Sequence, residues 1–80
     1  MVSVRYFAGA RPAAGGLSTE LVEASTLGEL VQTLADLHGE RLAVVLKASN
    51  FLVDGLTRHD RQAALRPGAT VDILPPFAGG

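Results

Sequence analysis

The sequence contains no cysteine, few aromatic residues and almost no net charge. Without cysteine the chain cannot form disulfide bonds, thiolate zinc sites or iron–sulfur clusters, and it has no cysteine nucleophile. It has one Tyr, three Phe and no Trp, so leucine, valine and alanine must fill most of any core. Lys and Arg number 7 against 8 Asp and Glu, a balance that argues against nucleic acid as the main partner.

Long hydrophobic runs are also missing. No apolar stretch approaches the ~20 residues that span a bilayer, and the first residues do not have the pattern of a signal peptide. The lack of cysteine fits a reducing compartment. We therefore expect a cytoplasmic protein with no membrane partner.

The length and composition suit one small domain. The chain has 80 residues, 48% of them hydrophobic, which is enough for one economical core. We expect residues 1–80 to form a single domain in which residues 75–80 are a flexible functional tail. His59 and Asp60 are expected on a loop surface, because no nucleophile of recognisable context accompanies them. The sequence predicts no enzymatic site and no metal site.

The first half of the chain predicts two strands and a helix. Val2, Val4 and Tyr6 alternate with outward positions and indicate a strand with one face inward. The Gly-, Ala- and Pro-rich stretch 9–16 predicts a plain loop, because it lacks the lysine of a phosphate-binding loop. Residues 17–24 predict a second strand, paired with the first as a hairpin.

The segment from Thr26 to Gly39 has the clearest helical pattern. Thr26 can cap the first turn, Glu29 stands at the capping-box spacing, and Gly39 can end the helix. His38, in the last turn, is expected to be either a partner of the negative end of the helix dipole or a plain surface residue. The apolar stripe expected to be buried consists of Leu27, Leu30, Val31, Leu34 and Leu37.

The second half predicts two more strands. Residues 40–50 fit either a short helix or a strand, residues 51–53 predict a short strand before an Asp-Gly turn, and residues 56–68 predict a polar loop. Val71 and Ile73 share one face of the last strand. The compact arrangement places the first and last strands side by side and parallel, with the helix as a right-handed crossover.

These elements predict an α+β fold. It is a ubiquitin-like β-grasp roll with a mixed sheet of four to five strands, one main helix on one face and an extended C-terminal tail. Pro75 and Pro76 end the sheet and extend the tail, which can reach about 18 Å. Gly79 and Gly80 have no side chain and can thread a channel too narrow for other residues. The pattern indicates a thin probe with a carboxylate at its tip.

The chain resembles the ThiS/MoaD family of ubiquitin-like sulfur carriers. The matching segments are VRYFAGAR at the start, TLGELVQTL in the helix and LRPGATVDILPPFAGG at the end. The Pro-Pro-x-x-Gly-Gly ending is most similar to that of the small subunit of molybdopterin synthase. Val53-Asp54-Gly55 departs from the Val-Asn-Gly that is frequent in the family, and Glu40–Ser49 has no clear counterpart.

The resemblance implies a non-catalytic sulfur donor with no bound cofactor. An E1-like adenylating enzyme would use ATP to activate the Gly80 carboxylate, and a sulfur donor would then leave a thiocarboxylate there. The loaded tail would enter the large subunit of molybdopterin synthase and give its sulfur to cyclic pyranopterin monophosphate, in molybdenum cofactor biosynthesis.

The tail is therefore the expected site. Gly80 would carry the reacting group, and Phe77 would either anchor the tail in the partner or fold back onto its own sheet. The expected partner-binding residues are Leu74, Pro75, Pro76, Phe77, Ala78 and Gly79. Three alternatives stay open: a sulfur carrier for thiamine thiazole or another acceptor, a ubiquitin-like protein modifier, and a plain binding module with an inert tail.

Overall fold

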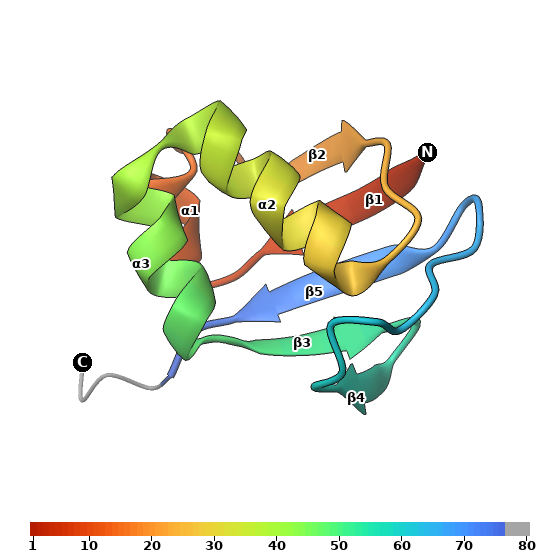
Figure 1. The fold of residues 1–80 in the computed structure, drawn as a ribbon. Coiled ribbons are helices and arrows are strands. Elements are labelled where there is room, and N and C mark those ends of the chain that lie inside the picture. Colours follow the sequence, from red (N-terminus) through yellow and green to blue (C-terminus); the bar gives the residue numbers. More distant parts are fainter. Residues whose placement is uncertain (77–80) are drawn as a thin grey trace.

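The structure is a computed structural model that describes residues 1–76. It contains a mixed five-stranded sheet with helices packed across one face (Figure 1). The elements in chain order are β1 (Val2–Tyr6), α1 (Ala10–Ala13), β2 (Thr19–Val22), α2 (Leu27–His38), α3 (Glu40–Ala48), β3 (Asn50–Val53), β4 (Leu56–Arg58) and β5 (Thr70–Leu74).

The order of the strands in the sheet is β2-β1-β5-β3-β4. β1 and β5 are parallel, with Val4 opposite Val71 and Tyr6 opposite Ile73, and the other pairs are antiparallel. The predicted β-grasp roll is confirmed, including the parallel pair that joins the two ends of the chain. The last strand therefore lies in the middle of the sheet, and whatever follows it leaves from there.

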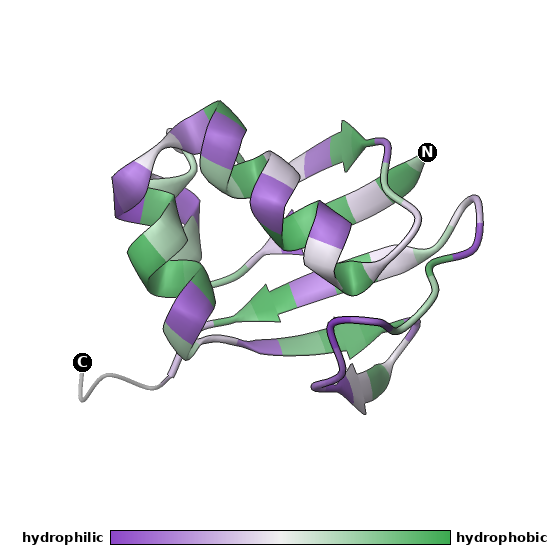
Figure 2. Ribbon diagram, in the orientation of Figure 1, coloured by the Kyte–Doolittle hydropathy of each residue, from purple (hydrophilic) through white to green (hydrophobic). Residues whose placement is uncertain are grey.

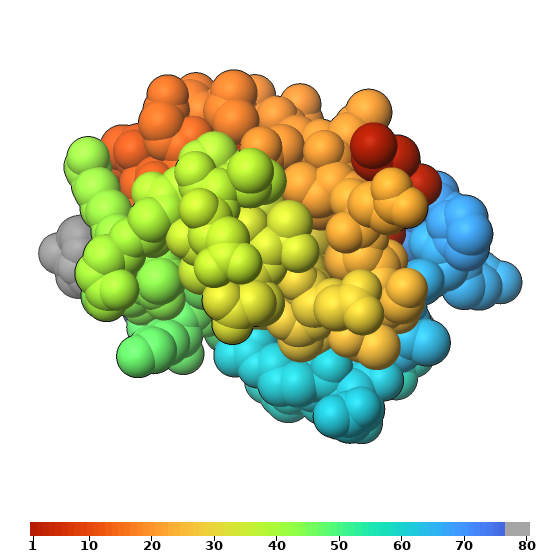
Figure 3. All heavy atoms as spheres, turned by 45° about the horizontal axis from the view of Figure 1, so that its top comes forward, coloured from red at the N-terminus to blue at the C-terminus, as the bar shows by residue number. Residues whose placement is uncertain are grey.

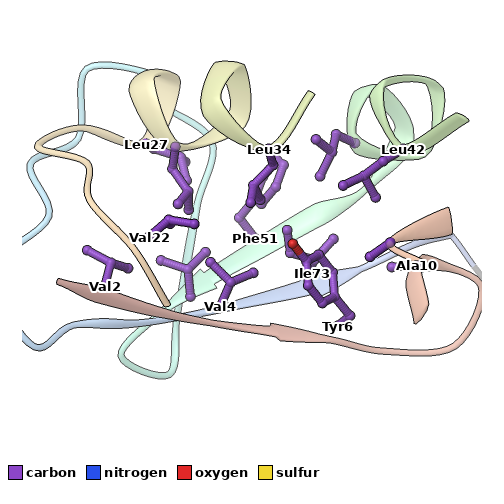
Figure 4. Packing of buried hydrophobic residues seen from close by; sticks show 14 of the residues in the cluster. Val2, Val4, Tyr6, Ala10, Val22, Leu27, Leu34, Leu42, Phe51 and Ile73 are labelled. Carbon is purple, nitrogen blue, oxygen red and sulfur yellow. The ribbon is translucent and has the colours of Figure 1, made fainter. Parts of the chain in front are cut away.

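The core lies between the sheet and the helices α2 and α3. Leucines from the two helices point down onto the inward residues of β1, β3 and β5 (Figure 4). Val4, Leu34, Leu42 and Ile73 are fully buried. The inward faces predicted for the first and last strands are confirmed.

Helix α2 begins as the sequence predicts. Thr26 Oγ1 accepts a hydrogen bond from the Glu29 amide at 3.1 Å, and Glu29 Oε1 accepts one from the Ser25 amide at 2.8 Å. Two backbone donors of the helix start are thereby satisfied. In Figure 3 the segment after β4 lies against this end of the helix, and the Gly28 amide donates to the Arg61 carbonyl at 2.9 Å.

The last turn of α2 differs from the prediction. Leu37 is 58% exposed, whereas His38 is mostly buried, with 15% of its side chain accessible. The reason is the helical period: Leu34 is fully buried, and the position four residues later continues the same stripe better than the position three residues later. Of the two alternatives for His38, the plain surface residue was wrong, and His38 does lie in the last turn of α2.

The glycine-rich stretch after β1 is not a plain loop, and that prediction was wrong too. Ala10, Ala13 and Ala14 are buried at helical spacing, and Ala10–Ala13 form the short helix α1. Alanine has the strongest helix propensity, and a proline in the first turn costs no hydrogen bond. Gly15 and Gly16 follow with φ values of 74° and 92°, which end the turn.

The second half contains two elements that the sequence left open or missed. Residues 40–48 are helix α3, which packs beside α2 and α1, so the sheet carries more than one helix. Leu56–Arg58, predicted as loop, form strand β4, which pairs with β3 across a turn. Asp54 and Gly55 in this turn have φ values of 50° and 87°, as a tight hairpin requires. The chain directly after β4, residues 59–62, is hydrophilic (Figure 2).

Candidate functional site

The tail begins at the end of the central strand. β5 ends at Leu74, Pro75 is half-buried, and Pro76 is exposed and lies outside the sheet. Leu74 is opposite the first residue of β3, and the Phe7 amide donates to the Ile73 carbonyl at 3.2 Å. The tail therefore leaves the sheet between the end of β1 and the start of β3. The prediction that the strand ends before Pro75 is confirmed.

The predicted site residues divide into two groups. Leu74, Pro75 and Pro76 are described, and they form what we call the root of the tail. The other predicted residues, Phe77, Ala78, Gly79 and Gly80, lie outside the described residues. Their roles, including the proposed anchoring by Phe77, stay predictions.

The open face of the sheet, opposite the helices, carries a bidentate ion pair. Arg5 on β1 donates from Nε to Asp72 Oδ1 at 2.6 Å and from Nη2 to Asp72 Oδ2 at 2.8 Å. Asp72 lies on β5 and is the one buried charged residue within residues 1–76. The hydrogen bond and the charge of Asp72 raise the pKa of Arg5. A buried carboxylate needs such a partner, because charge is costly to remove from water.

Sequence reasoning missed this pair, although the signal was present. No role was predicted for Arg5. Yet Arg5 stands between the inward residues Val4 and Tyr6, and Asp72 stands between Val71 and Ile73. Once the two strands are predicted to be parallel neighbours, the two charged residues share the opposite face.

An aromatic ring holds the same guanidinium from another side. The Arg5 Cζ atom lies 5.6 Å from the centre of the Phe7 ring, a distance at which a cation is attracted to an aromatic face. Phe7 directly follows β1 and is half-buried. The open face thus carries a fixed guanidinium. Its partner Asp72 lies two residues before Leu74 on β5, where the root of the tail begins.

A second polar cluster lies on the helix side of the sheet. The Tyr6 hydroxyl donates to Glu20 Oε1 at 2.7 Å, and His38 Nε2 lies 2.7 Å from the same oxygen. The rings of Tyr6 and His38 meet edge to face, with centres 6.2 Å apart. Burial, followed by the hydrogen bond to Glu20, raises the pKa of Tyr6 above its ordinary value of 10.0. The cluster joins β1, β2 and the end of α2.

This cluster predicts a dependence of stability on alkaline pH. The folded state keeps the Tyr6 proton to higher pH than the unfolded state, whose tyrosine ionises near ~10. The free energy of unfolding should therefore fall as the pH rises above ~10, and Tyr6→Phe should remove that part of the fall. Because Tyr6 is the one tyrosine, phenolate absorbance follows it alone. Ionisation of the folded protein at the ordinary pKa would contradict this arrangement.

The other polar candidates are surface residues. His59 and Asp60 are exposed, as expected, and Asp60 Oδ1 accepts a hydrogen bond from the Gln62 amide at 2.9 Å within a turn. Among residues 1–76, no three His, Asp or Glu side chains gather in a way that could hold a metal ion. No helix in the same part of the chain is long and apolar enough to cross a membrane.

Comparison with known proteins decides the family. A model of the ThiS family matches residues 4–80, nearly the whole chain. The chain belongs to the ThiS family. The resemblance noted from the sequence is thereby confirmed. No curated protein matches the sequence significantly.

Solved structures share the fold. The Amycolatopsis orientalis BexX/CysO complex contains a chain with a TM-score of 0.84 and 22% identity, over 100% of both chains. Small archaeal modifier protein 1 from Methanosarcina acetivorans has a TM-score of 0.83 and 22% identity, over 99% of this chain and 95% of that one. The complex of subunits 1 and 2 of molybdopterin-converting factor from Helicobacter pylori 26695 contains a chain with a TM-score of 0.76 and 24% identity, over 99% of this chain and 97% of that one. The fold is that of ThiS/MoaD-like sulfur carriers.

Proposed function

We propose that this member of the ThiS family carries sulfur as a thiocarboxylate on Gly80. The observation that carries the proposal is the extent of the family match, which continues past the end of β5 at Leu74 as far as Gly80. The segment beyond the last strand is therefore part of what the chain shares with its family. Residues outside a core are free of packing constraints, so a shared ending favours a functional role over a structural one.

The chemistry follows from the weakness of a carboxylate as an electrophile. We propose that an E1-like adenylating enzyme joins the Gly80 carboxylate to AMP from ATP and releases pyrophosphate. A sulfide donor then attacks the acyl carbon, and AMP leaves with one of the original carboxylate oxygens. The product is a thiocarboxylate, a good sulfur nucleophile. ATP belongs to the partner, and the carrier itself needs no bound cofactor.

The chain's own residues present the reacting group. Pro75 and Pro76 cannot continue the ladder, so they direct the chain away from the sheet. Gly79 and Gly80 have no side chain, and a backbone of this width can enter a narrow, dry channel in a partner. The partner supplies the catalytic groups, and the carrier supplies a tethered reagent at a high local concentration.

We propose molybdopterin synthesis as the pathway, in the cytoplasm. The loaded tail would enter the large subunit of molybdopterin synthase and give sulfur to cyclic pyranopterin monophosphate. The Pro-Pro-x-x-Gly-Gly ending supports this acceptor, as does the likeness to a protein found in a complex of molybdopterin-converting factor subunits. Protein modification through an isopeptide bond is the second candidate, supported by the likeness to a small archaeal modifier protein.

Reconstitution with purified components tests the choice of acceptor. Thiocarboxylated protein is mixed with the large subunit from the same genome and cyclic pyranopterin monophosphate. We expect molybdopterin to form with loss of sulfur from Gly80, and no product from the carboxylate form. Isopeptide-linked adducts in a lysate, with no molybdopterin formed, would instead identify a modifier. Sulfur transfer only to another small acceptor, such as a thiazole precursor, would identify a different carrier.

A further inference from the structure

We propose that Arg5, oriented by Asp72, binds a carboxylate on the adenylating enzyme and so docks the open face of the sheet on that partner. The inference rests on the proposed function, because it takes as its partner the enzyme that activates Gly80. Each proposed fate of Gly80 that uses its carboxylate begins with this activation. The docking step is therefore needed whichever acceptor receives the sulfur.

The first argument is the state of the guanidinium. An arginine has five N–H donors. Within residues 1–76 its bonds to Asp72 use Nε and Nη2, and Nη1 makes no hydrogen bond there. Half of the Arg5 side chain is accessible, at 51%, against 10% for Asp72. The pair therefore presents the outer edge of a guanidinium to solvent, with the inner edge already held.

The second argument is that this edge is fixed in space. Asp72 holds the guanidinium through two bonds, and the Phe7 ring lies 5.6 Å from its central carbon. A flexible surface arginine loses side-chain entropy when it binds, and one that is already oriented loses less. A planar fork with free N–H groups matches the geometry of a carboxylate. The chemistry therefore favours Asp or Glu as the group that meets Arg5.

The third argument is the surroundings of the pair. Phe7, Leu52 and Leu74 are all half-buried beside the strands that carry Arg5 and Asp72. Arginine within an apolar patch is a frequent centre of binding energy at protein interfaces. The patch continues directly into the root of the tail, so a partner that binds the open face also receives the tail.

The docking contact lies far along the chain from the reacting group. Gly80 lies eight residues after Asp72, and an extended chain of that length spans up to about 28 Å. The Arg5 contact therefore acts on binding and not at the reacting carbon. Variants of Arg5 should raise the KM for the carrier in the adenylation reaction and leave kcat nearly unchanged.

Binding to the purified adenylating enzyme from the same genome tests the proposal. We expect Arg5→Ala to weaken binding about tenfold to a hundredfold and Arg5→Lys to weaken it less. Arg58→Ala is the matched control, because it removes the same charge. Arg58 is exposed and stands opposite buried Phe51, so it lies on the helix side of the sheet. Its loss should change the dissociation constant by no more than about twofold.

Asp72→Asn tests the orienting role. It should weaken binding in the wild-type background and have no further effect in the Arg5→Ala background, because Asp72 acts through Arg5. Urea unfolding shows which variants remain folded, and Arg5→Lys keeps the test usable if Asp72→Asn does not fold. Equal binding by Arg5→Ala and wild type would overturn the proposal, as would equal losses in Arg5→Ala and Arg58→Ala.

The same samples separate this inference from the proposed function. Mass measurement after incubation with the adenylating enzyme, ATP and sulfide shows whether wild-type Gly80 is loaded. If wild type is loaded and Arg5→Ala has an unchanged KM, the docking proposal fails alone. If wild type is never adenylated by an enzyme that activates its own known carrier, the proposed function fails.

Discussion

Deletion of Gly80, or Gly79→Leu, is expected to abolish sulfur loading and leave the fold intact. Deletion removes the reacting carboxylate and places the new terminus about 3.5 Å short of the acyl-transfer site. A misplacement of even 1 Å can cost about a hundredfold in rate, so loading should fall below about 1% of wild type. Gly79→Leu places a branched side chain where the channel is expected to admit backbone alone.

Stability should not change in these two variants. Both positions follow β5, which ends at Leu74, so the free energy of unfolding in urea should stay within about 0.5 kcal/mol of wild type. Gly9→Leu is the matched control: Gly9 has a φ of −64°, and a Cβ atom added there meets nothing within 4 Å. This control should load normally. Normal loading of Gly79→Leu would refute the narrow channel.

Leu34→Ala is expected to have the opposite effect. It should lower the stability of the fold without changing any residue of the tail. Leu34 is fully buried between α2 and the sheet (Figure 4). Truncation of such a leucine costs about 3 kcal/mol, and a small domain has a total stability of only about 5 kcal/mol. About 2 kcal/mol would remain, so the unfolded fraction at 25 °C should rise from about 0.02% to about 3%.

Circular dichroism during urea unfolding measures the effect. Leu37→Ala is the control, since the same change is made one turn later on the same helix at a residue that is 58% exposed. It should shift the free energy of unfolding by no more than about 0.5 kcal/mol. Similar losses in the two variants would contradict the packing of α2 that the structure shows.

The fold could be predicted where short-range patterns agree with the tertiary structure. Val2, Val4 and Tyr6 are all buried, and so are Val71 and Ile73, as their alternation indicates. The pairing of the first and last strands followed from handedness and compactness, without any local signal. The start of the helix could also be predicted, because Thr26 and Glu29 make the capping hydrogen bonds that their spacing predicts.

The errors arose where burial depends on distant parts of the chain. The alanines of α1 carry no polar pattern that would mark a helix, and α1 packs against α3, which is distant in the sequence. All three residues of β4 are exposed, so no alternation reveals the strand. His38 is mostly buried because it meets Glu20 and Tyr6, and nothing near it in sequence indicates this.

The two parts of the candidate site also differed in how far the sequence predicts them. A tail that begins with two prolines and ends with two glycines was predicted from the sequence, because prolines end a strand and glycines have no side chain. The Arg5–Asp72 pair was not, because its members lie 67 residues apart and meet only when β1 and β5 are placed side by side. The chemistry of the tail is therefore a prediction from the sequence, whereas the Arg5–Asp72 pair was found only in the structure.

The most direct test of the central claim is the intact mass of the protein after incubation with its adenylating enzyme, ATP and a sulfide donor. The account predicts a gain equal to the replacement of one oxygen by sulfur, and fragmentation should place the change on Gly80. An unchanged mass in the presence of an enzyme that hydrolyses ATP and loads another carrier would contradict it. So would a sulfur atom found at any other residue.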